Sequence, residues 1–215
     1  WRMQMGQFQG VYSRKGVFIC LEGGDGAGKS TQSKLLCEWL ESLGHSVLLT
    51  REPGGTRAGQ QMREILLDPA TGELSPRAEA LLYAADKAQH VDHVIMPALE
   101  RGEVVVTDRY VDSTLAYQGA GRAIPEEELA AIARWATCDL RPHLTVLLDQ
   151  EPDHGLDRFT GRDRIEGEPV EFHQRVRQHF VSLAQVDPDH YLVLDAREPI
   201  ATIHGQIRGR VEGLL

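Results

Sequence analysis

The stretch Val17-Phe-Ile-Cys-Leu-Glu-Gly-Gly-Asp-Gly-Ala-Gly-Lys-Ser-Thr31 decides the fold of this chain. An apolar run, Val17–Leu21, is typical of a buried strand, and the amphipathic pattern over Lys29–Leu43 predicts a helix that ends at Gly44. Between them, Gly23–Ser30 matches G-x-x-x-x-G-K-[ST] in full. Such a loop points backbone N–H groups and a helix N-terminus at phosphate oxygens. The stretch therefore predicts a nucleoside triphosphate site, with Lys29 on the terminal phosphates and the Ser30 hydroxyl as a ligand of Mg²⁺.

Short apolar runs alternate with helical patterns along the rest of the chain. Four further runs predict strands: Val47–Leu49, Val104–Val106, Leu144–Leu148 and Tyr191–Leu194. Helices are expected over Pro76–Leu99, kinked or ended by Pro97, and over Pro125–Thr137, Glu171–Val186 and Ile200–Leu215. This alternation predicts an α/β fold of the P-loop NTPase type, a five-stranded parallel sheet flanked by helices on both faces. Ligands of such sheets bind at the carboxyl ends of the strands.

Length and composition fit one domain in a soluble protein. The chain has 215 residues, and we expect an N-terminal extension over residues 1–15, a candidate for disorder, and a single domain over 16–215. The net charge of -9 argues against binding a nucleic acid polymer through the overall field. No apolar run is long enough for a membrane span, and residues 1–15 have no apolar core for a secretory signal. Three widely spaced cysteines, without a CxxC pair, indicate a reducing compartment, so we expect a cytoplasmic protein.

The loops after the second and third strands suggest an acceptor site. No Asn-Lys-x-Asp motif is present and no apolar run ends in Asp-Glu, which disfavours a guanine-specific switch and a water-activating ATPase. Arg109 directly follows the third strand and is expected to project into the crevice beside the P-loop, where a guanidinium can grip a phosphate. Asp108 is positioned to orient that arginine or to hold water on Mg²⁺.

The chain resembles the bacterial thymidylate kinase family of P-loop nucleoside monophosphate kinases. The resemblance runs from Gly16 to about Ala184 and rests on five motifs in the family's order: Glu22–Thr31, Arg51–Thr56, Ala78–His90, Asp108–Tyr110 with Tyr117–Gly119, and Asp163–Glu166. It implies phosphorylation of dTMP to dTDP by ATP and Mg²⁺ in dTTP synthesis, by direct in-line transfer. It also implies a homodimer packed through helices, with the apolar face of the 76–99 helix as a candidate interface.

The resemblance also assigns roles to individual residues. ATP is expected on Gly23, Gly24, Asp25, Gly26, Ala27, Gly28, Lys29, Ser30 and Thr31. Arg109 and Arg63 resemble arginines that hold the acceptor phosphate. Glu52 matches a carboxylate near that phosphate and the metal. With Ser30 as a direct ligand of Mg²⁺, Asp108 and Glu52 are therefore candidates for holding the ion through a bound water. Asp25 matches an acid at the deoxyribose 3′-hydroxyl and is counted with Lys29 and Arg109 as catalytic.

The remaining implied roles concern the base and a short lid. Tyr83 and Lys87 occupy positions where the family usually has Phe, stacking on thymine, and Arg, bonding a base carbonyl. Ser113, Thr114, Tyr117 and Gln118 match the segment around the base and sugar. Residues of about 150–170 resemble the lid over ATP, and because Gly26 stands where some members carry arginine, Arg162 or Arg158 is expected as an arginine finger. Gly155, Gly161 and Gly167 are possible hinges.

Two alternatives stay open from the sequence. Tyr83 and Lys87 leave room for a kinase of another monophosphate, such as dUMP or dGMP. A non-catalytic nucleotide-binding homologue is disfavoured by retention of Lys29, Arg109 and several arginines in the lid.

Overall fold

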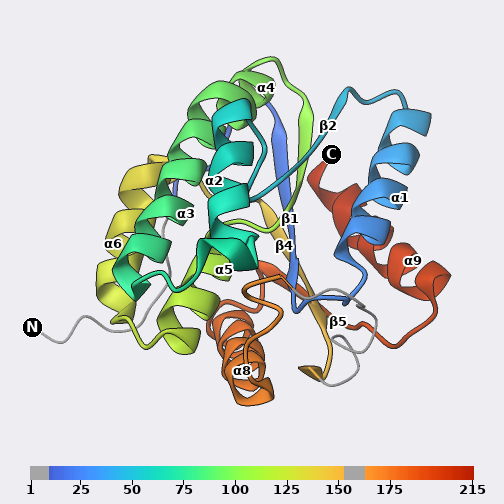
Figure 1. The fold of residues 1–215 in the computed structure, drawn as a ribbon. Helices are drawn as coiled ribbons and strands as arrows, with labels where there is room; N and C mark the ends of the chain where they lie inside the picture. The colour runs from blue at the N-terminus through green and yellow to red at the C-terminus, as the bar shows by residue number, and fades with distance from the viewer. Residues whose placement is uncertain (1–9, 153–162) are drawn as a thin grey trace, which may run out of the picture.

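The sheet of the computed structural model has five strands, all parallel. The structure describes residues 10–152 and 163–215. The strands are β1 (Val17–Gly23), β2 (Val47–Arg51), β3 (Val104–Asp108), β4 (Leu144–Asp149) and β5 (Tyr191–Asp195), in the spatial order β2-β3-β1-β4-β5 (Figure 1). This arrangement confirms the fold class expected from the sequence.

The register of the central strands places the two phosphate-directed loops side by side. β1 lies between β3 and β4, and Leu21 of β1 is paired with Asp108 of β3. The N–H of Arg109 then donates to the carbonyl of Leu21 at 2.9 Å. The P-loop after β1 and the Asp108–Arg109 corner after β3 therefore leave the same edge of the sheet, next to each other.

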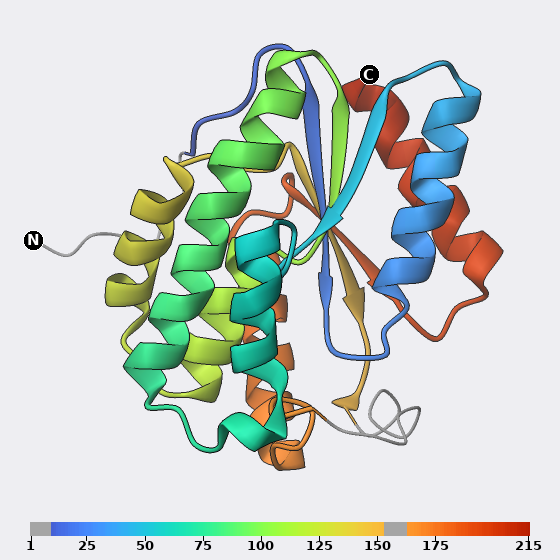
Figure 2. The same cartoon turned by 45° about the horizontal axis from the view of Figure 1, so that its top comes forward.

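Two helices cover one face of the sheet: α1 (Lys29–Ser42) and α9 (Ile200–Val211), which is followed by a short 3₁₀ turn, η4 (Glu212–Leu214) (Figure 2). Alternate residues of β1, Ile19 and Leu21, face this side and pack with Leu36 of α1 and Ile207 of α9, all four buried. The period of two along a strand sends Phe18 and Cys20 to the opposite face. The last α-helix, α9, ends at Val211, four residues before the end at Leu215 that the sequence predicts.

The other face carries the remaining helices of the described residues. They are α2 (Arg57–Leu67), α3 (Pro76–His90), the π-helical turn η2 (Val91–Ile95), α4 (Met96–Glu100), α5 (Val111–Thr114), the π-helical segment η3 (Leu115–Gly121), α6 (Glu126–Thr137) and α8 (Val170–Val186), with a 3₁₀ turn η1 (Pro69–Thr71). Separate apolar clusters form beneath η2 with α4 and beneath η3 with α8. The sequence did not anticipate that residues 111–121 are helical.

The expected interruption at Pro97 takes a particular form. The helical path continues from Pro76 to Glu100, with the π-helical turn Val91–Ile95 directly before α4. Proline lacks an N–H and its ring crowds the carbonyl four residues earlier, and a wider π turn accommodates both effects. The chain thereby keeps Ile95 and Leu99 buried against the sheet.

The described part of the N-terminal segment, residues 10–16, lies against the loop before β4. Val11 pairs with that loop on both sides, because its N–H donates to Asp139 at 2.8 Å and its carbonyl accepts from Arg141 at 2.9 Å. The Tyr12 hydroxyl accepts from Arg141 at 3.0 Å. None of the helices in residues 10–152 and 163–215 is long and apolar enough to cross a membrane.

Candidate active site

The P-loop wraps the carboxyl end of β1 and requires glycine where it turns. Gly23 has φ 138°, and a Cβ there would lie 2.4 Å from the carbonyl oxygen of Leu148. Gly28, also at positive φ, stands directly before α1. Lys29 in the first turn of α1 folds back, so that its Nζ donates to the carbonyls of Gly23 at 3.1 Å and Gly24 at 2.7 Å. The loop thus sets a buried ammonium group at its mouth.

Arg109 reaches the same loop from the end of β3. Its backbone adopts a left-handed conformation with φ 71°, which is uncommon for a non-glycine residue. Nη1 donates to the carbonyl of Gly23 at 3.1 Å, and Nη2 donates to Asp25 at 2.6 Å. The Lys29 ammonium and the Arg109 guanidinium therefore converge on one carbonyl oxygen, that of Gly23.

Two cavities meet around these cations. The first, the P-loop cavity, has a volume of about 420 Å³ and is lined by Gly26, Gly28, Lys29, Ser30 and Thr31. The second, the acceptor cavity, has a volume of about 120 Å³ and is lined by residues of α2, α3, α5 and η3. Both are lined by Asp25, Glu52, Arg63, Arg109 and Glu166, so these five residues form the boundary between them. Ala27 differs from its neighbours, because its side chain is buried in the core beneath α1.

Asp25 is the acidic centre of that boundary. Burial alone would raise the pKa of its carboxyl, but Arg109 and Lys29 outweigh burial and hold the pKa below its ordinary value. The hydroxyl of Tyr117 donates to Asp25 at 3.2 Å, and the ring of Tyr117 lies under the Arg109 guanidinium, 5.0 Å from ring centroid to Cζ. Burial lowers the pKa of Lys29. The group is consequently a compact set of opposite charges at the junction of the cavities.

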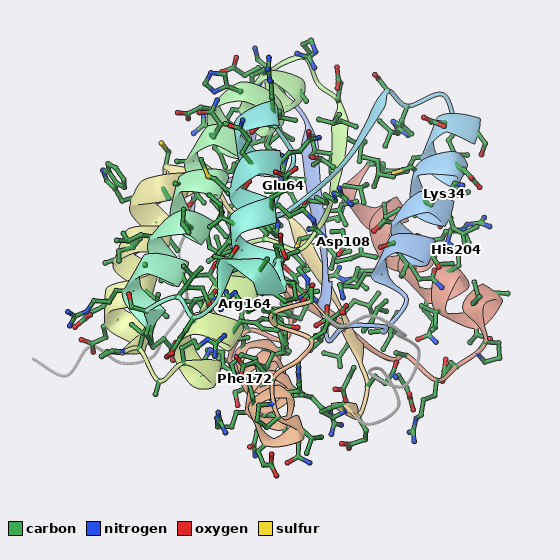
Figure 3. The ribbon with its side chains drawn as sticks, in the orientation of Figure 1. Lys34, Glu64, Asp108, Arg164, Phe172 and His204 are labelled. Carbon is green, nitrogen blue, oxygen red and sulfur yellow. The ribbon has the colours of Figure 1, made fainter. Side chains whose placement is uncertain are left out.

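Of the residues expected near a metal ion, two lie together. Ser30 Oγ donates to Asp108 Oδ2 at 2.7 Å, at the edge of the P-loop cavity, and Figure 3 shows Asp108 in the middle of the molecule between α1 and the α2 side. A hydroxyl and one carboxylate are the oxygen set that Mg²⁺ uses with a nucleotide, since it keeps waters and phosphates as its other ligands. These residues therefore fit Mg²⁺.

Glu52, the third metal candidate, is engaged elsewhere. Its buried carboxylate lies 3.0 Å from Lys87 Nζ and 2.9 Å from His90 Nδ1. His90 Nε2 bonds in turn to the Thr50 hydroxyl at 2.6 Å. Burial would raise the pKa of Glu52, but Lys87 and His90 lower it. Lys87, 2% exposed, thus serves first as the ion-pair partner of Glu52.

The acceptor cavity has aromatic, hydroxyl and cationic walls. Arg63 of α2 enters it while donating to the carbonyl of Pro53 at 3.1 Å. Tyr83 lines the cavity from α3, and burial raises the pKa of its hydroxyl. Thr114 Oγ1 is buried there without a hydrogen-bond partner among the described residues. Gln118 also lines the cavity but donates its amide N–H to Glu79 at 3.0 Å.

Glu22 has a structural role that sequence reasoning missed. Its fully buried carboxylate accepts from the N–H groups of Tyr110 at 2.8 Å and Ser113 at 3.2 Å, and from the Ser113 hydroxyl at 2.6 Å. Ser113 Oγ accepts from Arg109 Nη1 at 3.0 Å. Glu22 thereby fixes the turn that carries Arg109. An acid in an otherwise apolar strand, directly before the P-loop, was the available signal.

Other contributors also lacked an assigned role. Asp163 and Glu166 line the acceptor cavity, and Arg51 lines the P-loop cavity. Buried Glu79 accepts hydrogen bonds from Gln118, Arg122 and Arg164, which joins α3 to η3 and to the segment before α8. Each contact joins positions far apart in the chain, so no local pattern marks them.

The proposed lid lies only partly within the described residues. Arg158 and Arg162, the candidates for an arginine finger, and the hinges Gly155 and Gly161 lie outside the described residues. Arg164, which follows them, is committed to Glu79 and to the carbonyl of Leu66 at 2.8 Å (Figure 3).

Comparison with known proteins identifies the family. A family model described as thymidylate kinase matches residues 21–207. The chain belongs to the thymidylate kinase family. It is 56% identical to the thymidylate kinase of Cutibacterium acnes over 93% of this chain and 98% of that protein. It is 54% identical to the thymidylate kinase of Clavibacter sepedonicus over 93% of this chain and 96% of that protein.

A solved structure agrees with this assignment. The crystal structure of thymidylate kinase from Ehrlichia chaffeensis superposes with a TM-score of 0.77 at 30% identity, covering 91% of this chain and 98% of that one. The resemblance inferred from five motifs is thereby confirmed. Membership of the thymidylate kinase family makes the chain an enzyme of dTMP phosphorylation in dTTP synthesis, and the family uses ATP as phosphoryl donor.

Proposed function

We propose that the chain transfers the γ-phosphoryl group of ATP directly to dTMP across the boundary between its two cavities. The observation that carries this proposal is the convergence of Lys29 and Arg109 on the Gly23 carbonyl, each at 3.1 Å. A donor phosphate at Lys29 and an acceptor phosphate at Arg109 would then adjoin. In-line transfer needs little from the protein beyond such positioning and charge compensation.

On the acceptor side, Arg109 and Arg63 bind the phosphate of dTMP. Both line the boundary of the cavities, and Asp25 with Ser113 fixes the direction of the Arg109 guanidinium. The attacking oxygen belongs to a phosphate that is already ionised, so no general base is required. The ATP γ-phosphoryl bond to the β-phosphate oxygen breaks as the new P–O bond forms, giving ADP and dTDP.

On the donor side, the P-loop N–H groups and Lys29 bind the ATP phosphates, and Ser30 with Asp108 holds Mg²⁺. A Mg²⁺ ion held by these two residues would supply positive charge to offset that of the ATP phosphates. The 2.7 Å contact between Ser30 and Asp108 supports this pairing, and Glu52, committed to Lys87 and His90, is the weaker candidate. Arg162 or Arg158 remains our candidate for a finger on the transferred group.

For the base, we propose that thymine stacks on Tyr83 and that Thr114 Oγ1 bonds its polar edge. Thr114 supports this role because it is a buried hydroxyl on the cavity wall without a partner among the described residues. Lys87 is less available for the base, since its ammonium is held by Glu52 at 3.0 Å. Discrimination against dUMP would then rest on the fit of the thymine methyl group in a small cavity.

A coupled ADP-release assay tests the function. With ATP and Mg²⁺, turnover with dTMP should exceed turnover with dUMP and dGMP. Arg109→Lys should raise KM for dTMP and lower kcat, because Lys lacks the two-pronged contact with phosphate. A preference for dGMP would favour the alternative of another monophosphate kinase. ATP binding without ADP release in the presence of any monophosphate would favour the non-catalytic alternative.

We also propose a homodimer packed through the layer of α2, α3 and α6. Three large apolar side chains on these helices are exposed, namely Ile65, Leu81 and Trp135, the last at 82%. Sedimentation equilibrium should give twice the chain mass, and Leu81→Glu should shift the equilibrium to monomer.

A cytoplasmic location is supported by three free cysteines, of which Cys20 and Cys37 are buried and Cys138 is exposed.

A further inference from the structure

A third cavity lies on the opposite side of α5 from the acceptor cavity. It has a volume of about 310 Å³ and is enclosed by β1, β4, β5, α5, α6 and the end of α8. It has no lining residue in common with the acceptor cavity or the P-loop cavity. We call it the rear cavity. Its volume is in the range in which proteins enclose small organic molecules.

Most of the rear cavity wall is apolar. Leu115, Ala130, Leu140, Pro142 and Leu183 contribute aliphatic surface from four different segments. Such a wall favours a ligand with a compact apolar body, because burying apolar surface is the main favourable term in binding.

Asp112 is the polar group that distinguishes one end of this wall. The hydroxyl of Tyr191 donates to Asp112 Oδ2 at 2.6 Å. In the part of the chain that the structure describes, no lysine, arginine or histidine forms an ion pair with this carboxylate. Burial, followed by the neighbouring Glu22, raises the pKa of Asp112 to about 7. The Tyr191 hydroxyl and the charge of Arg141 lower this pKa without cancelling the increase, so the charge of the carboxylate is only partly compensated.

Among the described residues, none of the other charged groups of the rear cavity forms an ion pair with Asp112. They are Glu22 from β1, Glu126 and Arg134 from α6, Arg141 from the loop before β4, and Asp187 and His190 around the start of β5. Arg141 is engaged by Asp187 at 2.7 Å and by Tyr12. Burial lowers the pKa of His190 to about 4, so its ring is neutral at pH 7. With Asp112 ionised, acids outnumber cations in the wall.

We propose that the rear cavity is a second small-molecule site, which binds a compound with an apolar body and a single cationic nitrogen, such as an aryl amidine or an aralkyl amine. The cationic nitrogen pairs with Asp112 and the apolar body lies against the aliphatic wall. Glu22, whose carboxylate holds Ser113 and Tyr110, belongs to the same wall, so an occupant would sit directly behind the turn that carries Arg109.

Binding of benzamidine to the full chain tests the proposal, with benzamide as the neutral compound of the same shape. At pH 8, titration calorimetry or ligand-observed NMR should show benzamidine binding about tenfold more tightly than benzamide, since a charge-assisted pair is roughly twice as strong as a neutral one. The advantage should shrink at pH 6, where Asp112 is mostly protonated. Saturating dTMP should leave benzamidine binding intact, because the sites share no lining residue.

Two variants separate a specific site from general attraction to an acidic protein. Asp112→Asn should abolish the preference for benzamidine while keeping the Tyr191 contact. Glu126→Gln removes the same charge at an exposed position of the rim and should keep the preference. A preference unchanged in Asp112→Asn, equal losses in both variants, or displacement of benzamidine by dTMP would each overturn the proposal. Ala130→Phe, which fills the cavity without changing charge, should weaken both compounds; unchanged binding of both would likewise overturn it.

Discussion

Replacing Glu22 by glutamine tests how the catalytic turn is held. Gln keeps one carbonyl oxygen for the N–H groups of Tyr110 and Ser113, now accepted at 2.8 and 3.2 Å. It places an NH₂ group where the second oxygen accepts the Ser113 hydroxyl at 2.6 Å. The hydroxyl proton must then turn away, and a buried negative charge beside Arg109 is lost.

The expected size of the effect follows from these contacts. A hydrogen bond to a charged group contributes about 1.5–3 kcal/mol and a neutral one about 0.5–1.5 kcal/mol. The exchange therefore removes about 1–2 kcal/mol of the free energy that stabilises the turn carrying Arg109. At about 1.4 kcal/mol per tenfold, kcat/KM for dTMP should fall roughly 5- to 30-fold. KM for ATP should change little, because the carboxylate of Glu22 does not line the P-loop cavity.

A double-mutant cycle with Ser113→Ala provides the assay. In the Ser113→Ala background the hydroxyl is gone, so Glu22→Gln should cost at least about 1 kcal/mol less than in the wild type. Asp112→Asn, a matched loss of a half-buried carboxyl on α5 that lines the rear cavity, should leave kcat/KM within about twofold. Additive effects within about 0.5 kcal/mol would refute the argument that Glu22 acts through the Ser113 hydroxyl.

Three further outcomes are expected. Lys29→Ala should lower kcat by about 100-fold or more, as expected for loss of a charge-stabilising group. The control variant Lys34→Ala, on the exposed face of α1, should leave kcat unchanged (Figure 3). Near-native turnover without Lys29 would exclude the mechanism. Lys87→Met leaves the buried Glu52 carboxylate without its cation and should lower the free energy of unfolding by about 3–5 kcal/mol in urea titrations; a loss under about 1 kcal/mol would contradict the importance of the pair. The native pKa of Asp112, about 7, lies above the ordinary value of 3.8, so between those values the native chain binds a proton that the unfolded chain has lost. The contribution of Asp112 to the free energy of unfolding should therefore fall as pH rises through that window. Asp112→Asn should make the free energy of unfolding, measured by urea unfolding, less dependent on pH between pH 5 and 8. An unchanged pH dependence would show that another group titrates in this window.

The local sequence determined the strands, the order of the elements and the P-loop. Each of these follows from neighbouring residues: apolar runs form strands, glycines permit the positive φ of Gly23 and Gly28, and a helix begins at Lys29. It also indicated Arg109, because a residue that follows a buried parallel strand must emerge at the ligand-binding edge. The roles given to individual residues remain predictions for the assays above.

Only the tertiary structure decided which of these groups meet. The pairing of Leu21 with Asp108 brings Arg109 to Gly23, and the packing of α3 against the loop after β2 commits Lys87 to Glu52. Glu22 acquires a hydrogen-bond partner 91 residues away along the chain, and Glu79 acquires one 85 residues away. Such contacts depend on the register of strands and the direction of side chains in space, which no short pattern of residues encodes. The amino-acid sequence thus indicated a phosphate-binding edge of the sheet. The tertiary packing determined which charged groups pair there, and it formed the acceptor cavity and the separate rear cavity.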